Sequence, residues 1–388
     1  MSLLDTASLV VTPNGTKASK LYSVVPSSGA GDLSVTRATT ATRVNSAGLI
    51  ESVASNVPRL DYSNGSCPSI LVEPQRTNIA LWSEQIDNNS AWFYDNGGTG
   101  TVNVTPNYAT APNGLNTADR LQYLKGDGYG RAQQLFTGVV GQTYTLSIYV
   151  KSLSGTPTIA LLYDGASVLT INTTTNWVRH TITFVASSTD IRIFTGLFTS
   201  VPSTSSTADV LLWGAQLEAG SYATSYIPTT SASVTRNADV ISKTSISSLI
   251  GQTQGTVFLD FVATGGDVNH EILGITLNGG GSEFIALYSL TNGALYFVTN
   301  LIGGVLIDAS SFGERFKVAY SFNSGSHVLY VNGVQIYSST IASTYSLLNA
   351  LYLGVNAGGT GQQLLNTNLS ALWKTRLTNT QLAQLTTI

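Results

Sequence analysis

Apolar and polar residues alternate along much of the chain. Large apolar side chains occupy every second position from Thr143 to Val150 and from Phe316 to Phe322, and a similar pattern runs from Trp177 to Val185. This period of two predicts half-buried β-strands, because successive side chains of a strand point to opposite faces. A helical period fits only two short segments, Ser247 to Gly251 and Thr380 to Leu385.

Turn residues separate these predicted strands. Asn332-Gly333 lies between the apolar runs 329–331 and 334–337, and this pair tolerates the positive φ angles of a two-residue hairpin. Many short strands joined by Gly, Asn and Ser turns are typical of antiparallel sandwiches. We therefore predict an all-β fold with two antiparallel β-sandwiches.

Changes in composition along the chain suggest its boundaries. Residues 1–75 are rich in Thr, Ser, Ala and Arg and alternate poorly, which predicts an extended N-terminal arm. Aromatic residues become frequent at Trp82, and Thr229 to Thr235 has the composition of a linker. The predicted domains are an arm over 1–75, a first sandwich over 76–228 and a second sandwich over 229–388.

Charge and cysteine content exclude several classes of protein. Only 10% of residues are charged and the formal net charge is −3, which argues against a nucleic-acid partner. The single cysteine, Cys67, cannot form an intrachain disulfide and is expected to be a small buried residue. Membrane insertion is not expected, because no apolar stretch approaches the roughly 20 residues of a spanning helix. Since the start, Met1 to Asp5, has no signal-peptide features, we expect synthesis in a cytoplasm.

Candidate catalytic and metal-binding residues are dispersed. The nearest acidic couples, Glu84 with Asp87 and Asp267 with Glu271, lie in turn-like sequence and are interpreted as surface acids. His180 is expected in a core, and His270 and His327 at the surface. No zinc site is predicted, because neither Cys67 nor any histidine has a ligand neighbour. The turns at Gly126–Gly128 and Asp164-Gly165 offer weak candidates for calcium, and Gly279–Gly281 is interpreted as a hairpin tip.

Sugar binding requires exposed aromatic faces beside groups that hydrogen-bond to hydroxyls. Two segments of the first sandwich combine them, and Trp213 and Trp373 are instead assigned to cores. The candidate glycan-binding residues are Trp92, Tyr94, Asp95, Asn96, Tyr129 and Arg131. An alternative interpretation places Trp92 in the core of the sandwich.

Short motifs resemble those of known families. The stretches 36–45, 58–62 and 71–78 resemble the N-terminal region of many bacteriophage structural proteins. The stretches 82–92, 214–218 and 226–228 resemble a carbohydrate-binding-module-like jelly roll. The C-terminal block is similar to concanavalin A-like or laminin G-like sandwiches, in the motifs 255–258, 329–333, 351–354 and 377–382.

The resemblance implies a virion protein, either a tail or head fibre or another adhesin that binds host cell-surface glycans. It also implies attachment to other virion proteins through the arm, and a homotrimer. No enzymatic activity and no cofactor are expected. Two alternatives remain open, a purely architectural protein of the capsid or baseplate and a polysaccharide depolymerase.

Overall fold

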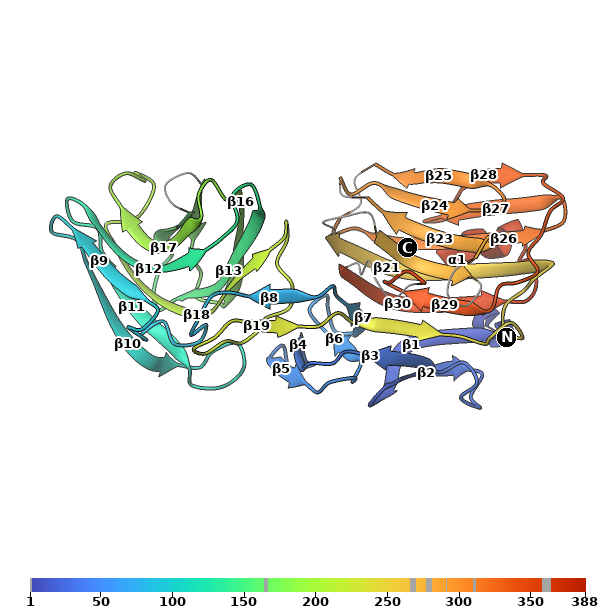
Figure 1. Cartoon of the computed structure of the whole chain (residues 1–388), viewed down its shortest axis with the longest axis horizontal. Helices are drawn as coiled ribbons and strands as arrows, with labels where there is room; N and C mark the ends of the chain where they lie inside the picture. The colour runs from blue at the N-terminus through green and yellow to red at the C-terminus, as the bar shows by residue number, and fades with distance from the viewer. Residues whose placement is uncertain are drawn as a thin grey trace. The chain divides into compact units, whose positions relative to one another are not determined.

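The computed structural model describes residues 2–163, 167–265, 270–276, 281–290, 292–309, 312–357 and 364–388. Its elements are almost all β-strands, which confirms the predicted all-β fold (Figure 1). The chain forms two compact units. Unit 1 contains residues 2–48, 52–75 and 237–388, and unit 2 contains residues 49–51 and 76–236.

Unit 2 consists of two five-stranded antiparallel sheets. One has the order β10-β11-β18-β13-β16 and the other β15-β14-β17-β12-β9. An apolar core that includes Leu146, Ile193 and Leu212 takes residues from both sheets, as expected of a sandwich. The strands of the sandwich are β9 (Phe93–Gly97), β10 (Thr101–Ala109), β11 (Ala118–Leu124), β12 (Tyr129–Thr137), β13 (Thr143–Ser152), β14 (Thr158–Tyr163), β15 (Ser167–Asn172), β16 (Val178–Val185), β17 (Asp190–Phe198) and β18 (Thr207–Ala219). The strands β8 (Arg76–Asn78) and β19 (Val234–Arg236) pair at the two ends of this segment.

Unit 1 is built on one long antiparallel sheet that packs on itself. Its order runs β25-β24-β23-β22-β29-β20-β3-β2-β1-β30-β21-β26-β27-β28, with β6 and β7 as a branch beside β30. The rings of Phe297 in β24 and Tyr320 in β26 lie 4.8 Å apart, so the two arms of the sheet meet across a shared core.

The elements of unit 1 have the following bounds. The N-terminal segment supplies η1 (Leu3–Thr6), β1 (Leu9–Lys17), β2 (Lys20–Val25), β3 (Leu33–Thr36), β6 (Arg59–Asp61) and β7 (Ser69–Val72). The C-terminal segment supplies β20 (Val240–Lys243), β21 (Gln254–Gly265), β22 (His270–Thr276), β23 (Phe284–Ser289), β24 (Leu295–Thr299), β25 (Gly303–Asp308), β26 (Arg315–Asn323), β27 (Ser326–Val331), β28 (Val334–Ser339), β29 (Ala350–Leu353), β30 (Leu364–Trp373) and α1 (Asn379–Thr386). Two other short strands are β4 (Ala41–Val44) and β5 (Ile50–Val53).

Local sequence signals account for two of these elements. Asn332 and Gly333 have φ angles of 48° and 84° and join β27 to β28, which confirms the predicted hairpin. The C-terminal helix α1 begins after Thr378, whose side chain accepts a hydrogen bond from the Gln381 amide while Gln381 binds back to the Thr378 amide. The other helical candidate, 247–251, forms turns.

The prediction of an extended arm over residues 1–75 is corrected by the structure. Strand β1 pairs with β30, and β3 pairs with β20, so the N-terminal segment forms the middle of the unit 1 sheet. Leu9, Val11 and Leu33 are fully buried in its core. The strands are short and β1 is bulged, which explains why their alternation is weak in the sequence.

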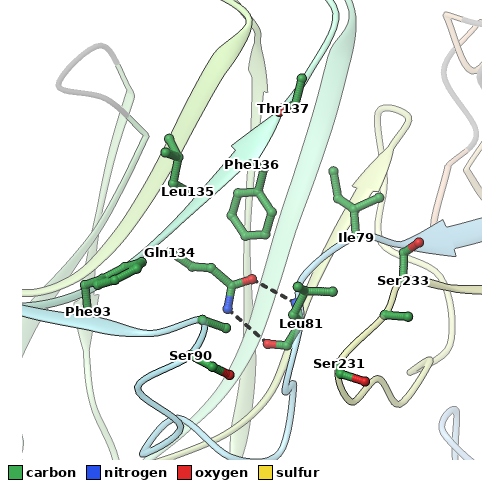
Figure 2. Close-up of a pocket in the computed structure, with 12 residues that line it drawn as sticks. Ile79, Leu81, Ser90, Phe93, Gln134, Leu135, Phe136, Thr137, Ser231 and Ser233 are labelled. Carbon is green, nitrogen blue, oxygen red and sulfur yellow. Dashed lines mark hydrogen bonds between the residues drawn. The ribbon is translucent and has the colours of Figure 1, made fainter.

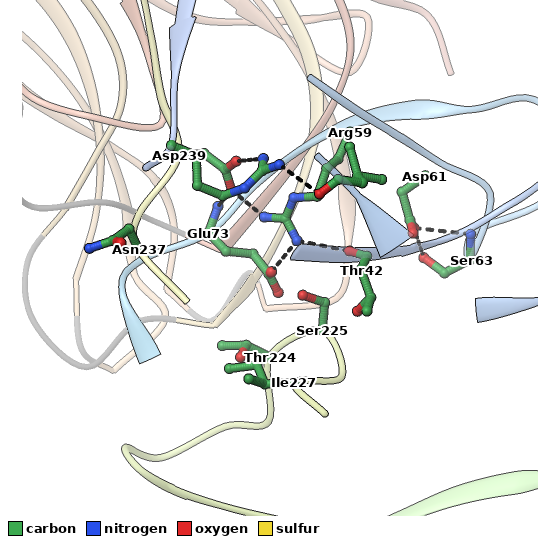
Figure 3. Close-up of polar contacts among 12 residues, drawn as sticks. Thr42, Arg59, Asp61, Ser63, Glu73, Thr224, Ser225, Ile227, Asn237 and Asp239 are labelled. Atoms are coloured by element: carbon green, nitrogen blue, oxygen red, sulfur yellow. Dashed lines mark hydrogen bonds and ion pairs between the residues drawn. The ribbon is translucent and has the colours of Figure 1, made fainter. Parts of the chain in front are cut away.

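A buried charge network holds this segment in place (Figure 3). Arg59 donates hydrogen bonds to Glu73, to Asp239 and to the backbone oxygen of Thr42. Arg37 donates to the other oxygen of Asp239 at 2.8 Å. Burial opposes the charge on Arg59, but the carboxylates of Asp239 and Glu73 outweigh it and raise its pKa. Each of the two arginines therefore has a buried carboxylate as a partner.

Candidate functional site

The outer face of β9 and β12 combines aromatic and charged side chains. In the antiparallel register Phe93 lies opposite Gln133, Asp95 opposite Arg131, and Gly97 opposite Tyr129. Buried residues alternate with more exposed ones along β12, so Ala132 and Phe136 face the core and these partners face outward. We call Phe93, Asp95, Tyr129, Arg131 and Gln133 the β9–β12 strip.

The middle of the strip is an ion pair stacked on aromatic rings. Arg131 donates through Nε and Nη2 to the same oxygen of Asp95, the Nε bond measuring 3.2 Å. Its guanidinium carbon lies 4.4 Å from the Tyr129 ring centroid and 4.5 Å from that of Phe194. Both members of the ion pair keep part of their surface exposed, 21% for Arg131 and 37% for Asp95. The guanidinium is thus held in one orientation and still reaches solvent.

Gly97 allows Tyr129 to lie against β9. A Cβ atom at position 97 would stand 2.4 Å from the Tyr129 ring, which is far inside van der Waals contact. On its other side Tyr129 stacks on Phe198 with ring centroids 6.2 Å apart. Any side chain at position 97 would therefore displace the tyrosine from the strip.

A groove of about 620 Å³ adjoins the strip at Phe93 (Figure 2). Gln134, which is buried, pairs with the backbone of Leu81 through two hydrogen bonds of 2.8 and 3.0 Å. Phe93 and Leu135 line the groove and are 52% and 50% exposed. Four hydroxyl-bearing residues also line it, namely Ser90, Thr137, Ser231 and Ser233. The groove therefore offers apolar surface together with hydrogen-bonding groups.

The structure brings together only half of the predicted glycan-binding residues. Asp95, Tyr129 and Arg131 share the outer face, but Trp92 is 2% exposed and packs in the core, its indole nitrogen donating to the Trp82 oxygen at 3.3 Å. Tyr94 turns to the core side of β9, donates to the Ile86 oxygen, and has a pKa raised by burial. Asn96 is exposed but lies on the opposite side of β9 from Asp95.

The burial of Trp92 and Tyr94 corrects their assignment as sugar contacts. The two positions differ by two residues, so one side of the strand takes both into the core. The same periodicity places Phe93 with Asp95 on the outer face. Phe93 was missed because three aromatic residues follow one another from 92 to 94, and composition alone does not say which of them are exposed.

The acids of the depolymerase alternative are held by structural contacts. Glu84 accepts a hydrogen bond from the Tyr226 hydroxyl at 3.2 Å, and burial raises its pKa. Asp119 accepts from the amides of Asp87 at 3.2 Å and Asn107 at 2.9 Å, and burial raises its pKa to about 6. Asp119 therefore connects the loop at Asp87 to strand β10.

The weak calcium candidates give no cluster of ligands. Asp127 accepts hydrogen bonds from the backbone and hydroxyl of Thr99, which lower its pKa. Asp164-Gly165, Asp267 and Gly279-Gly280 lie outside the described residues. Within the described part of the chain, no three His, Cys, Asp or Glu side chains gather as a metal site would require.

The described part of the chain also contains no helix that is long and apolar enough to span a bilayer.

No protein-family model and no curated protein matches the chain. Solved structures match parts of it. The CBM40 module of Ruminococcus gnavus IT-sialidase bound to α2,3-sialyllactose is 16% identical over 36% of this chain and 84% of its own, with a TM-score of 0.30. Domain 4 of AbnA, an extracellular GH43 arabinanase of Geobacillus stearothermophilus in complex with arabinotriose, is 17% identical over 42% and 82%, with a TM-score of 0.33.

A mutant Trypanosoma rangeli sialidase that displays trans-sialidase activity is 14% identical over 34% of this chain, with a TM-score of 0.29. The match spans only 22% of that sialidase. At these identities and TM-scores the likeness establishes neither a shared family nor a shared ligand.

Proposed function

We propose that the chain is a carbohydrate-binding protein and that the β9–β12 strip and its adjoining groove hold a short glycan. The observation that carries this proposal is the exposed ring of Phe93 in line with the oriented Arg131 and Tyr129. An aromatic face packs against the apolar side of a pyranose, and Arg131, Asp95 and Gln133 supply donors and acceptors for hydroxyls.

The dimensions of the strip suit an oligosaccharide. Phe93 and Gly97 are four residues apart on β9, which corresponds to roughly 13 Å of extended strand. The Tyr129 ring covers Gly97, so an aromatic group stands near each end of the strip with the ion pair between them. A glycan of a few sugar units extends over this distance.

The proposed activity is binding without cleavage. Paired-carboxylate hydrolysis needs two carboxyl groups roughly 5 to 10 Å apart on either side of the scissile bond. Asp95 is the one carboxylate of the strip, and it is engaged in an ion pair with Arg131. Incubation with host polysaccharide should accordingly produce no new reducing ends.

The finer proposal is that the protein is an adhesin or fibre of a bacteriophage virion, homotrimeric and located on the particle. It rests on the sequence resemblance of segments 36–45, 58–62 and 71–78 alone. Immunogold labelling of particles, together with the mass of the purified assembly, tests it. Unlabelled particles would leave carbohydrate binding as the proposal and remove the virion location.

Replacement of Phe93 provides the direct test of the glycan site. We expect Phe93→Ala to weaken binding to a responsive glycan by about tenfold, because it removes the exposed stacking surface without opening the core. Tyr108→Ala is the matched control, since Tyr108 is 45% exposed on β10, an edge strand of the opposite sheet. Affinities come from calorimetry after a glycan-array screen of the full chain.

Two outcomes would contradict the proposal. Equal losses for the Phe93 and Tyr108 variants would move the site away from the strip. If the full chain binds no glycan on the array or on host cells, the architectural alternative takes its place.

A further inference from the structure

Unit 1 carries a second, chemically different groove. It has a volume of about 840 Å³ and is bordered by residues 12–14 of β1, the loop between β6 and β7, and parts of β21, β26 and β30. Seven of its thirteen described lining residues have polar side chains, and none of the thirteen is aromatic. Its polar side chains include Asn14, Asn64, Ser66, Arg315 and Asn368.

Arg315 is fixed in this groove by a buried carboxylate. Its Nε and Nη2 atoms donate to the two oxygens of Asp260 at 2.8 and 2.6 Å. Asn368 donates to the same carboxylate at 3.0 Å, so both Asp260 oxygens are occupied. Asp260 is 6% exposed whereas the Arg315 side chain is 47% exposed. The acid therefore lies beneath the arginine and holds one edge of its guanidinium.

The other edge of the guanidinium is available to a ligand. A guanidinium has five N–H donors in a planar fork, and the contact with Asp260 uses the Nε–Nη2 side. Among the described residues, no acceptor binds Nη1 of Arg315. The Nη1–Nη2 edge has the spacing of a carboxylate and can bind one through two parallel hydrogen bonds.

We infer that this groove is a second binding site, which takes an acidic sugar through its carboxylate. Arg315 binds the carboxylate in this arrangement, and the amides of Asn14 and Asn64 and the hydroxyl of Ser66 reach the ring hydroxyls. Asn64 and Ser66 are exposed, and their side chains form no hydrogen bonds with other described residues. Arg315 is the one charged side chain among the described residues of the lining, and that set contains no acid that would repel the ligand.

The composition of the lining favours a sugar over a peptide. A peptide gains much of its affinity from apolar side chains in pockets or from pairing with an exposed strand edge. This groove has Val262 as its one branched aliphatic residue, and β21 and β30 both have strand partners on each side. A polyhydroxylated ligand matches the amides and hydroxyls more completely.

Cys67 gives the site its own reporter. It is the only cysteine of the chain, it lines the groove, and it is exposed, in contrast to the buried position predicted from the sequence. The experiment measures the rate at which N-ethylmaleimide alkylates Cys67 in the full chain as trigalacturonic acid is added. We expect saturating ligand to slow alkylation at least fivefold. The methyl ester of the same trisaccharide should leave the rate unchanged, because it has no carboxylate.

Four variants, two in the groove and two controls outside it, separate binding in the groove from a general effect of the sugar. Arg315→Lys keeps the positive charge but loses the planar pair of N–H donors. It should raise the concentration of trigalacturonic acid that protects Cys67 about tenfold. Arg120→Lys is the matched control, because Arg120 forms the same two-bond pair with Asp209 in unit 2, at 2.8 and 2.6 Å. Asn64→Ala leaves the pair with Asp260 intact, and should weaken protection severalfold. Phe93→Ala should not change it, so this site is tested independently of the strip.

Three results would overturn the inference. Equal protection by the acid and its ester would exclude recognition of the carboxylate. Absence of protection by trigalacturonic acid, confirmed by calorimetry, would exclude an acidic sugar of this kind. Protection by trialanine with a free C-terminus but not by its amide or by the sugar would assign the groove to peptide carboxylates.

Discussion

Glu271 is a carboxyl group buried in unit 1, and its titration should make stability depend on pH. Burial raises its pKa from 4.5 to about 7, and its described hydrogen bond, from the Tyr288 hydroxyl, is long at 3.5 Å. The folded state therefore binds the proton more tightly than the unfolded state does. Stability from this group is fully present below about pH 4.5 and is lost as the pH rises to about 7.

We expect Glu271→Gln to remove this dependence on pH. In the wild type, the ionisation of Glu271 lowers the free energy of unfolding by at most about 3 kcal/mol. The difference in unfolding free energy between variant and wild type should change between pH 4.5 and 7.5, measured by urea denaturation. Asp119, His180 and His327 titrate in both proteins and cancel in that difference. Asp190→Asn, at an exposed position of unit 2, is the control. A difference that stays constant with pH would show that Glu271 is ionised in the folded chain.

Single residues were predictable where strand periodicity and chemistry agree. Tyr129 and Arg131 lie two residues apart in β12, and Asp95 lies opposite Arg131 in β9, so the three share a face as an alternating pattern requires. His327 shows where this fails. It was expected at the surface, yet it is fully buried, with a hydrogen bond of 2.7 Å between its Nδ1 and the Tyr320 hydroxyl and one of 3.0 Å to the Ser343 oxygen. His180, expected in a core, is half-buried at the edge strand β16. Long-range partners decide such positions, and a single sequence does not reveal them.

At the scale of elements, the buried charges join strands that are far apart in sequence. Arg37 follows β3, Arg59 lies in β6, Glu73 follows β7 and Asp239 precedes β20. All four side chains are at most 1% exposed. The motifs that resemble phage proteins therefore contain residues with a structural role in unit 1.

Breaking this network should destabilise unit 1 strongly. We expect Arg59→Ala to cost about 3–5 kcal/mol in unfolding free energy, because it removes a buried guanidinium that contacts both Glu73 and Asp239. Arg120→Ala removes a solvent-accessible ion pair of unit 2, and should cost far less, because water screens the two charges. Denaturant unfolding followed by fluorescence and circular dichroism compares the two. Similar costs for both would mean that the buried charges are readily rehydrated.

At the scale of the whole molecule, the all-β class followed from strand periodicity, but the connectivity did not. The sequence suggested three consecutive parts, whereas unit 1 is formed by segments on either side of unit 2. Nothing local in residues 1–75 specifies that their partners lie beyond residue 236. The two ends of the intervening segment do meet, since β8 pairs with β19 and Asn237 donates to Gln75 at 3.1 Å.

This insertion predicts which fragments fold. Residues 237–388 alone should be insoluble or unfolded, because β30 loses β1 and β7, β20 loses β3, and Asp239 loses both arginines. A chain that joins 2–75 to 237–388 through a few Gly and Ser residues should fold, since its joined ends lie side by side. Residues 76–236 contain both sheets of unit 2 and should fold with the strip intact. Solubility and cooperative thermal unfolding check all three fragments. Cooperative folding of 237–388 without the N-terminal segment would restore the interpretation of residues 1–75 as an extended arm.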